Sequence, residues 1–134
     1  FPFISKIASG KLPCLSVFGN DYDTADGTGV RDYIHVVDLA KGHLAAFDFL
    51  KHRTCCEAFN LGTGKGTSVL ELLKAFEKAA GKEIPYKIAE RREGDIAVSY
   101  ADTRKAKEML GWEASFNIND MCRDGWKYAK INLF

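Results

Sequence analysis

Two arginine-containing clusters are the parts of this 134-residue sequence whose residue types suit a charged ligand. The first contains Arg31, and the second contains Arg92 and Asp95. A guanidinium group is planar, keeps its charge and donates two parallel hydrogen bonds, which is the geometry that a phosphate accepts. Two arginines from different loops would balance the two charges of a diphosphate. The alternative interpretation is a solvated surface cluster whose charges pair with one another.

A glycine-rich stretch, N-L-G-T-G-K-G-T-S at residues 60–68, is the next candidate for phosphate binding. A dinucleotide fingerprint requires a glycine three residues after Gly64, where Thr67 stands, and a P-loop requires a glycine where Phe59 stands. Two interpretations remain. Backbone N–H groups at the start of the following helix could attract an anion, or the stretch could be a tight turn between a strand and a helix.

Residues for catalysis or metal binding do not form a known pattern in this sequence. G-x-S-x-G, H-E-x-x-H and a tyrosine followed four residues later by lysine do not occur. The four cysteines, Cys14, Cys55, Cys56 and Cys122, have no C-x-x-C spacing. We therefore expect no catalytic, cofactor-binding or metal-binding residue in this chain, and reduced, mostly buried thiols.

Composition narrows the choice of partner. Hydrophobic residues make up 46% of the chain and charged residues 28%, as in an ordinary folded domain. With 19 Lys and Arg against 18 Asp and Glu, the chain has no overall field that would attract nucleic acid. No apolar run approaches the ~20 residues that span a bilayer. The first residues, Phe-Pro-Phe-Ile, lack an initiator Met and a basic region, so we interpret them as an internal segment.

Four helices are predicted around these clusters. The first begins after Asp38 as N-cap and points its apolar residues toward a core. The second has a capping box of Ser68 and Glu71 and ends at Gly81. The third runs from Asp102 to Gly111, and the fourth begins near Asn119, with Gly125 weakening its middle. The apolar residues of the first helix are Leu39, Ala40, Leu44, Phe47 and Leu50.

Short strands alternate with these helices and predict an α/β class. The strands are expected at residues 15–18, 30–37, 58–61 and 86–89, with a structured polar loop at 19–29. On an extended strand, Arg31, Tyr33 and His35 would share one face. The helices would flank a sheet that is incomplete in this chain. Residues 58–61 and the helix after Asp38 would then leave apolar faces exposed, which favours association between copies.

The motifs in residues 18–43 resemble those of UDP-glucose 4-epimerases. The pattern F-G-N-D-Y-x-T-x-D-G-T-G at 18–29 is particular to these enzymes, whereas R-D-Y-I-H-V-x-D-L-A-x-G-H at 31–43 resembles many extended short-chain dehydrogenases acting on nucleotide sugars. The similarity continues through N-L-G-T-G at 60–64 and R-R-E-G-D at 91–95 and then fades. It covers nearly the whole chain.

This resemblance implies an NAD-dependent reaction in the complete enzyme, which is expected to be a cytoplasmic homodimer of galactose metabolism. NAD takes hydride from C4 of the sugar, an upstream tyrosine takes the hydroxyl proton, and hydride returns to the other face of the rotated 4-keto sugar. The NAD-binding Rossmann domain and the catalytic Tyr and Lys would belong to a missing N-terminal half. Residues 1–134 would be the C-terminal portion that binds the UDP moiety, and this chain alone would be inactive.

The same resemblance assigns roles to individual residues. Arg31 and Arg92 match the residues that clamp the diphosphate, and Asp95 matches the acceptor for ribose hydroxyls. The strand that lines uracil corresponds to Ser16, Val17 and Phe18, with Phe18 packing on the base, although Ser16 departs from the Asn or Ala of other members.

Ser99 matches a position where family members carry either a bulky tyrosine or a small residue beside the sugar. Because serine is small, we expect the intact enzyme to accept UDP-GlcNAc and UDP-GalNAc as well as UDP-glucose and UDP-galactose. Two alternatives to the epimerase interpretation remain. One is a piece of a nucleotide-sugar decarboxylase or 4,6-dehydratase, and the other is a non-catalytic module that binds UDP-sugars.

Overall fold

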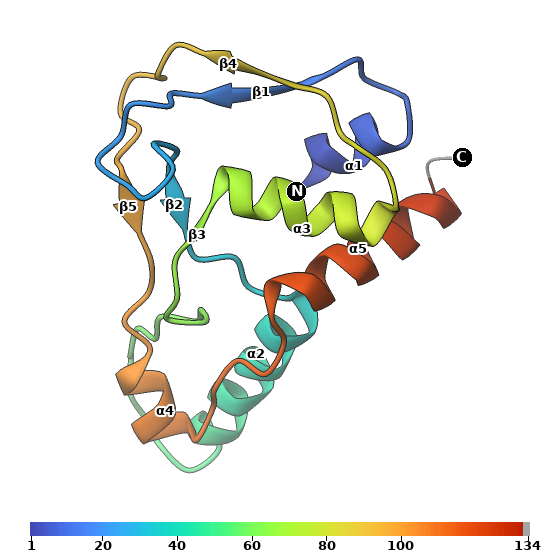
Figure 1. Cartoon of the computed structure of the whole chain (residues 1–134). Helices are drawn as coiled ribbons and strands as arrows, with labels where there is room; N and C mark the ends of the chain where they lie inside the picture. The colour runs from blue at the N-terminus through green and yellow to red at the C-terminus, as the bar shows by residue number, and fades with distance from the viewer. Residues whose placement is uncertain (133–134) are drawn as a thin grey trace.

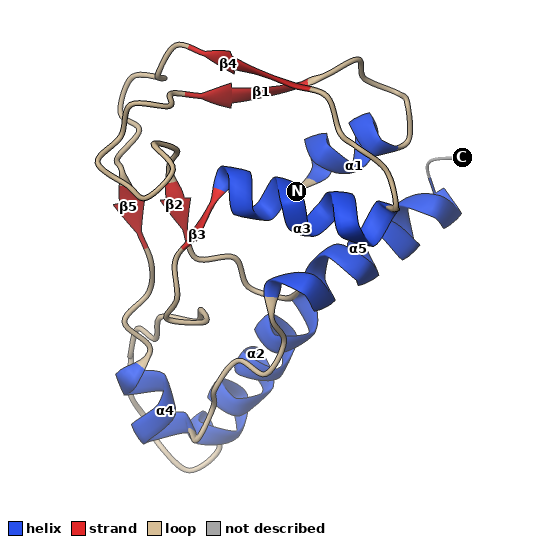
Figure 2. Ribbon diagram, in the orientation of Figure 1, coloured by secondary structure: helices blue, strands red, loops and turns tan. Residues whose placement is uncertain are grey.

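The computed structural model describes residues 1–132, which form two small sheets and a group of packed helices (Figures 1 and 2). This arrangement confirms the predicted α/β class. In chain order, the elements are α1 (Pro2–Ala8), β1 (Leu15–Phe18), β2 (Val30–Arg31), α2 (Val36–Leu50), β3 (Thr67–Ser68), α3 (Val69–Ala80), β4 (Tyr86–Ala89), β5 (Val98–Ser99), α4 (Arg104–Leu110) and α5 (Ile118–Asn132).

The two sheets lie along adjacent sides of the molecule (Figure 2). Strands β1 and β4 pair in parallel, with Leu15 opposite Tyr86. In the second sheet, β2 lies between β3, to which it is antiparallel, and β5, to which it is parallel. Arg31 lies opposite Ser99 in this sheet. Its strands are two residues long, so few ladder hydrogen bonds hold it together.

The hydrophobic core lies between α1, α3 and α5. Phe76 of α3 is fully buried, and its ring makes edge-to-face contacts with Phe1 at 5.8 Å and Trp126 at 6.2 Å between centroids. Gly125 of α5 also belongs to this contact region, because a Cβ there would lie 2.9 Å from Cε1 of Phe1. The glycine that weakens α5 locally therefore permits close packing against the start of the chain.

Helix α3 begins and ends as the sequence predicts. The Ser68 hydroxyl accepts a hydrogen bond from the Glu71 N–H at 3.0 Å, and the Glu71 carboxylate accepts one from the Ser68 N–H at 2.7 Å. This confirms the capping box. Gly81 ends the helix with φ of +68°, a conformation that glycine adopts without steric cost. The strands at 15–18 and 86–89 are confirmed with the same bounds.

The described residues contain five helices rather than four, because α1 escaped prediction. Its buried residues, Ile4, Ile7 and Ala8, follow a helical spacing. A helix of seven residues gives too few turns for that periodicity to stand out from a loop.

The boundary between β2 and α2 also differs from the prediction. The strand ends at Arg31 rather than continuing to residue 37, and α2 already begins at Val36. The N-cap is His35, whose Nδ1 accepts a hydrogen bond from the Val37 N–H at 3.1 Å, and not Asp38. Two β-branched valines favoured a strand in the sequence, but a cap and tertiary contacts outweigh that weak local preference.

Asp38 is instead a completely buried connector between α2 and the segment before α5. Its carboxylate accepts hydrogen bonds from the Ser115 N–H, the Ser115 hydroxyl and the Phe116 N–H, each at 2.9 Å. Burial alone would raise the pKa of Asp38, but these hydrogen bonds and the charge of Lys41 outweigh it and lower the pKa below its usual value.

The beginning of α4 was predicted one residue early. Asp102 was expected to be the N-cap, but the N-cap is Thr103, which makes no side-chain capping bond. The Asp102 carboxylate nevertheless accepts a hydrogen bond from the Arg104 N–H at 3.1 Å.

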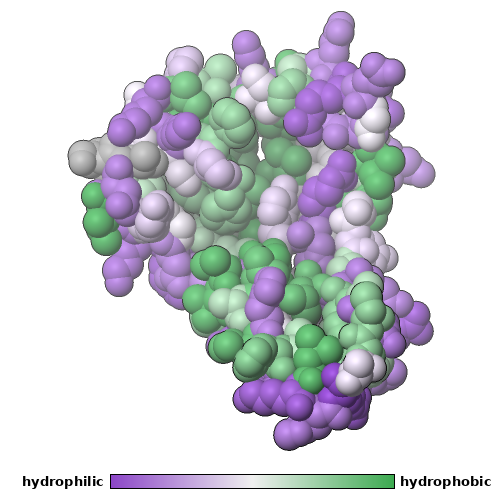
Figure 3. Space-filling view, turned by 180° about the vertical axis from the view of Figure 1, so that it is seen from behind, coloured by the Kyte–Doolittle hydropathy of each residue, from purple (hydrophilic) through white to green (hydrophobic). Residues whose placement is uncertain are grey.

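The outer face of α2 is apolar and exposed, so it does not point toward a core within this chain, and the exposed apolar face predicted for this helix beside an incomplete sheet is confirmed. Gly42 and Asp38 face the body of the protein, and a Cβ on Gly42 would lie 2.6 Å from Leu61 Cδ1. Figure 3 shows hydrophobic side chains gathered on the lower part of the molecule, where α2 lies. No helix in residues 1–132 is both long and apolar enough to cross a membrane. The exposed large hydrophobic residues of α2 are Val36, Val37, Leu44, Phe47 and Leu50.

Residues 58–61 do not form a strand, although the sequence predicts one. A strand requires a neighbouring strand with which to exchange backbone hydrogen bonds, and no described strand lies beside this segment. Its Leu61 packs on α2, so the unpaired segment and the exposed helix are neighbours.

Candidate functional site

One cavity of about 140 Å³ brings together six of the seven residues predicted to bind a ligand. Ser16, Val17 and Phe18 belong to β1, Arg31 lies at the end of β2, and the loop after β4 contributes Arg92 and Asp95. Arg31 and Arg92 are 61 positions apart in the sequence, yet they meet because β1 pairs with β4 and β2 pairs with β5.

Asp95 is the common partner of both arginines. Its carboxylate accepts hydrogen bonds from Arg92 Nε at 2.8 Å and from the terminal nitrogen Nη2 at 3.3 Å. Its Oδ1 also lies 3.9 Å from a terminal nitrogen of Arg31. Two cations with one carboxylate leave a positive charge beside the cavity, which suits an anionic ligand. The two sequence interpretations are therefore compatible, because the charges pair with one another and also line a cavity.

Phe18 forms part of the aromatic lining of the cavity. The guanidinium carbon of Arg92 lies 4.7 Å from the centroid of the Phe18 ring, within cation–π range. The ring is 39% exposed, so one part of its surface remains available for contact with a planar ligand.

Ser99 is not among the residues that line this cavity, although it lies directly beside it. It is opposite Arg31 in the β2–β5 pair, and its carbonyl accepts a hydrogen bond from the Asp32 N–H at 3.1 Å. Ser99 is exposed.

Of Tyr33 and His35, which were predicted to share a face with Arg31, only Tyr33 lines this cavity, because the strand stops at Arg31. Burial raises the pKa of the Tyr33 phenol above the ordinary value, against the opposing effect of Arg31, so the phenol stays protonated at neutral pH.

His35 lies outside this cavity, where it is buried and stacked on Phe116 at 4.4 Å between ring centroids. Because its Nδ1 accepts the Val37 N–H, we assign the proton to Nε2, which lies 3.3 Å from Asp124 Oδ2. His35 thus joins α2 to α5 and does not face the cavity.

Tyr22 is a lining residue that the sequence did not indicate as a site residue. The side chain is 6% exposed, and its hydroxyl is the one buried side-chain polar atom in residues 1–132 without a hydrogen-bond partner. The Arg91 guanidinium carbon lies 4.0 Å from the ring centroid, and Arg91 Nε donates to Asp21 at 2.7 Å. The available signal was a bulky aromatic residue inside an otherwise polar loop.

Close packing around Tyr22 fixes the neighbouring loop. A Cβ on Gly19 would lie 2.6 Å from Tyr22 Cε2, and Gly19 has φ of +79°, so only glycine fits there. Gly29 and Val69 are further lining residues that the sequence did not indicate.

The glycine-rich stretch at 60–68 binds an internal carboxylate. Asp32 accepts hydrogen bonds from the Thr63 N–H at 2.9 Å and the Gly64 N–H at 3.0 Å. A Cβ on Gly62 would lie 2.4 Å from Asp32 Oδ2, so this glycine allows the carboxylate to approach. Neither interpretation of the stretch holds as predicted. No strand within residues 1–132 directly precedes it, its two N–H donors lie before β3 and not at the start of a helix, and the anion that they bind is the side chain of Asp32.

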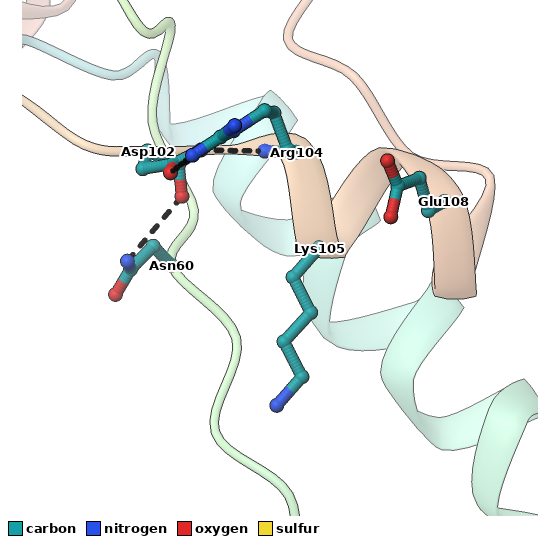
Figure 4. Close-up of a pocket in the computed structure, with 5 residues that line it drawn as sticks. All are labelled: Asn60, Asp102, Arg104, Lys105 and Glu108. Atoms are coloured by element: carbon teal, nitrogen blue, oxygen red, sulfur yellow. Dashed lines mark hydrogen bonds and ion pairs between the residues drawn. The ribbon is translucent and has the colours of Figure 1, made fainter.

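A larger surface cavity of about 330 Å³ lies between α4 and residue 60 (Figure 4). Arg104 pairs with Asp102, whose pKa falls to about 2 chiefly because of that side-chain hydrogen bond. Lys105 pairs with Glu57 at 2.7 Å. Figure 4 shows the Asn60 amide directed at Asp102. The cations are thus neutralised by carboxylates next to them, and this cavity is a weaker candidate for an anion site than the one at Asp95.

The cysteines differ from one another in exposure. Cys122 is fully buried, and burial raises the pKa of its thiol to about 12. Cys14 is half-buried, but Cys55 and Cys56 are exposed, so the prediction of mostly buried thiols is wrong for that pair. Residues 1–132 contain no group of three or more His, Cys, Asp or Glu side chains placed to hold a metal ion.

Comparison with known proteins defines the class. The GDP-mannose 4,6-dehydratase family matches residues 1–125, and this chain belongs to that family. Within it, the chain is similar to UDP-glucose 4-epimerases and corresponds to their C-terminal part. It is 58% identical over 132 residues to the UDP-glucose 4-epimerase of Bacillus subtilis and 57% identical over 131 residues to that of Homo sapiens. In both cases 98% of the chain is aligned.

The chain spans 39% of the length of the Bacillus subtilis enzyme and 38% of the human enzyme. Solved structures agree with this match. The UDP-glucose 4-epimerase of Bifidobacterium longum in complex with NAD+ and UDP superposes with a TM-score of 0.94 and 54% identity, covering 98% of this chain and 39% of that one. The UDP-glucose 4-epimerase of Stenotrophomonas maltophila, with bound NAD and formylated UDP-arabinopyranose, superposes with a TM-score of 0.94 and 52% identity. This match covers 97% of this chain and 39% of that one.

Proposed function

We propose that this chain binds the UDP moiety of a UDP-sugar and is the C-terminal part of an NAD-dependent UDP-glucose 4-epimerase of galactose metabolism. The observation that carries the proposal is the convergence of Arg31, Arg92 and Asp95 on one cavity beside Phe18. The names of similar structures, which contain UDP or a UDP-sugar together with NAD, support the choice of ligand. Relatives at 57–58% identity favour an epimerase over a dehydratase.

Each residue would act on a different part of the ligand. Arg31 and Arg92 would hold the diphosphate through charge-assisted hydrogen bonds, while Asp95 would exchange part of its contact with the arginines for ribose hydroxyls. Phe18 would pack on uracil, and the backbone of β1 would line its edge. Holding UDP fixed while the sugar rotates would place either face of C4 near the nicotinamide.

NAD does not fit the described residues of this chain. The glycine-rich turn at 62–64, which could otherwise offer N–H groups to a diphosphate, is filled by Asp32. We therefore propose that the dinucleotide is held by a part of the full-length protein outside this chain, together with the catalytic Tyr and Lys. The cavity of about 140 Å³ is also smaller than the ~300–1,000 Å³ typical of small-ligand sites, which supports a site shared with the rest of the protein. We expect this chain alone not to epimerise, and the full-length enzyme to be a cytoplasmic homodimer.

The test uses a full-length protein that contains this sequence. Arg31→Ala and Arg92→Ala should each weaken UDP binding by about 10- to 150-fold, because a hydrogen bond to a charged group contributes about 1.5–3 kcal/mol. Arg104→Ala is the matched control, since Arg104 is also paired with an aspartate but lies outside the cavity. Isothermal titration calorimetry with UDP gives the affinities. Equal effects at Arg104 and Arg92 would contradict the proposed site.

Turnover distinguishes the alternatives for the reaction. We expect the full-length protein to interconvert UDP-galactose and UDP-glucose but to leave UDP-glucuronate and dTDP-glucose unchanged. Conversion of either of the latter two would instead indicate a decarboxylase or a 4,6-dehydratase. UDP binding with no turnover of any of these substrates would indicate a non-catalytic module.

The small side chain of Ser99 beside Arg31 supports tolerance of N-acetylated sugars. We expect the full-length protein to act on UDP-GlcNAc, and Ser99→Tyr to reduce that activity while largely retaining activity on UDP-glucose. Turnover of UDP-glucose together with no turnover of UDP-GlcNAc by the unmodified protein would refute this assignment.

A further inference from the structure

Asp32 follows Arg31 directly and is tied to two other segments by four hydrogen bonds. Its Oδ1 accepts from the Thr63 N–H at 2.9 Å and the Thr63 hydroxyl at 2.5 Å. Its Oδ2 accepts from the Gly64 N–H at 3.0 Å and the Ala101 N–H at 3.2 Å. One carboxylate thus connects the end of β2, the glycine-rich turn before β3 and the segment that follows β5.

These bonds supplement a sheet that is too short to fix its own register. Strand β2 makes two residue pairs with β3 and two with β5. A pairing of that length has few ladder hydrogen bonds. The Asp32 carboxylate adds side-chain bonds to both flanking segments. The Asp32 backbone N–H also donates to the Ser99 carbonyl at 3.1 Å.

The side chain of Arg31 has little other support. One terminal nitrogen donates to the Val30 carbonyl at 2.8 Å, and the other lies 3.9 Å from Asp95, beyond hydrogen-bond distance. The direction of the guanidinium group therefore depends mainly on where the backbone of β2 places it. Asp32 itself does not line the cavity.

We propose that Asp32 is a positioning residue for the ligand: its four hydrogen bonds to the glycine-rich turn and the β5 segment hold Arg31 where it can bind the diphosphate of a UDP-sugar. This rests on the proposed function. The glycine-rich turn then serves UDP binding indirectly, as the receptor for Asp32.

Asp32→Asn in the full-length protein tests the proposal. In this variant an amide nitrogen, which is a donor, replaces one carboxylate oxygen and faces N–H donors. The hydrogen bonds that this oxygen accepted are therefore lost. Asp38→Asn is the matched control, because Asp38 accepts three hydrogen bonds in the same manner but lies outside the cavity. Both variants should have a lower Tm. We expect the Kd for UDP to rise at least tenfold in D32N and to stay within about twofold in D38N.

A second ligand, uridine, distinguishes a misplaced Arg31 from a general loss of structure in D32N. Uridine lacks the diphosphate, so its affinity should be nearly unchanged in D32N if the defect passes through Arg31. Titrations of UDP and uridine, well below the Tm of each variant, give the comparison. If D32N does not fold, Thr63→Val removes the hydroxyl bond to Asp32, together with two bonds between the same hydroxyl and the Lys65 backbone, and should weaken UDP binding several-fold.

Each result decides something different. Failure of the unmodified protein to bind UDP refutes the proposed function and this inference with it. Normal UDP affinity in D32N, or in T63V where that variant replaces it, refutes the inference alone. An equal loss for uridine, or an equal loss of UDP affinity in D38N, also overturns it, because general destabilisation then explains the result.

Discussion

The exposed apolar face of α2 makes a specific prediction for the isolated 134-residue chain. Leu44 is 65% and Phe47 is 63% exposed, and Val36, Val37 and Leu50 surround them. Fully burying such a side chain contributes about 1.5–3 kcal/mol, so covering the exposed two thirds of each contributes about 1–2 kcal/mol. In a symmetric pair of chains, these two residues together would contribute about 4–8 kcal/mol.

Association itself costs about 4–15 kcal/mol in lost translational and rotational freedom, and the remaining residues of the face offset part of that cost. Since the gain and the cost are of similar size, we expect at most a weak dimer, and a Kd on the order of 100 µM, or about 5.5 kcal/mol, is the working value for the experiment. Sedimentation velocity over a concentration series from about 5 to 500 µM would measure it by mass action.

The decisive variant is Leu44→Glu combined with Phe47→Glu, which should leave the chain monomeric throughout this range. Tyr128→Glu combined with Ile131→Glu is the control, because these residues of α5 are 68% and 71% exposed with the same spacing. A wild-type chain that is monomeric at 500 µM, or a control pair that disrupts the dimer equally, would refute the reasoning about α2.

Three further results follow from individual buried or exposed groups. Asp38 and Asp26 have pKa values below their usual range. Burial alone would raise both pKa values, but hydrogen bonds to the carboxylates outweigh it. The donors are Phe116 and Ser115 at Asp38, and Ser68 and Thr28 at Asp26. Because the folded state binds these protons less readily than the unfolded state, the two carboxylates stabilise the fold above about pH 4. This contribution to the free energy of unfolding is lost as the pH falls through the pKa values of the folded state. Urea denaturation between pH 3 and 7 should show this loss, and Asp38→Asn should lower the stability at pH 7 by about 1–3 kcal/mol and flatten the acid limb. Tyr22→Phe removes a buried hydroxyl without a partner, so it should leave the free energy of unfolding unchanged or raise it by up to about 1–3 kcal/mol, and a clear loss of stability would show that the hydroxyl is satisfied. Iodoacetamide at pH 8 should modify Cys55 and Cys56 quickly and Cys122 hardly at all, since burial raises the Cys122 pKa to about 12, and peptide mass spectrometry would detect the reverse order.

Local chemistry made several elements predictable from the sequence. The capping box and Gly81 act within one helix, so α3 could be bounded without knowing what it packs against. The pairing of Arg92 with Asp95 is similarly local, because the two residues are three positions apart in one turn. By contrast, the strand expected at 58–61 and a core for the apolar face of α2 both needed partners that the described residues do not supply.

Residue types and spacing predicted the α/β class and singled out Arg31, Arg92 and Asp95. The family resemblance added Ser16, Val17 and Phe18, and all six residues line the cavity at Asp95. Only the tertiary structure decided how those residues meet and which neighbours take other roles. His35 caps helix α2, the Asp32 carboxylate occupies the glycine-rich turn, and Tyr22 lines the cavity. The physical reason is that a capping or packing choice depends on donors and surfaces far away in the sequence. Thr63 is 31 residues and Ala101 is 69 residues from Asp32, and a local sequence pattern does not predict contacts between residues so far apart.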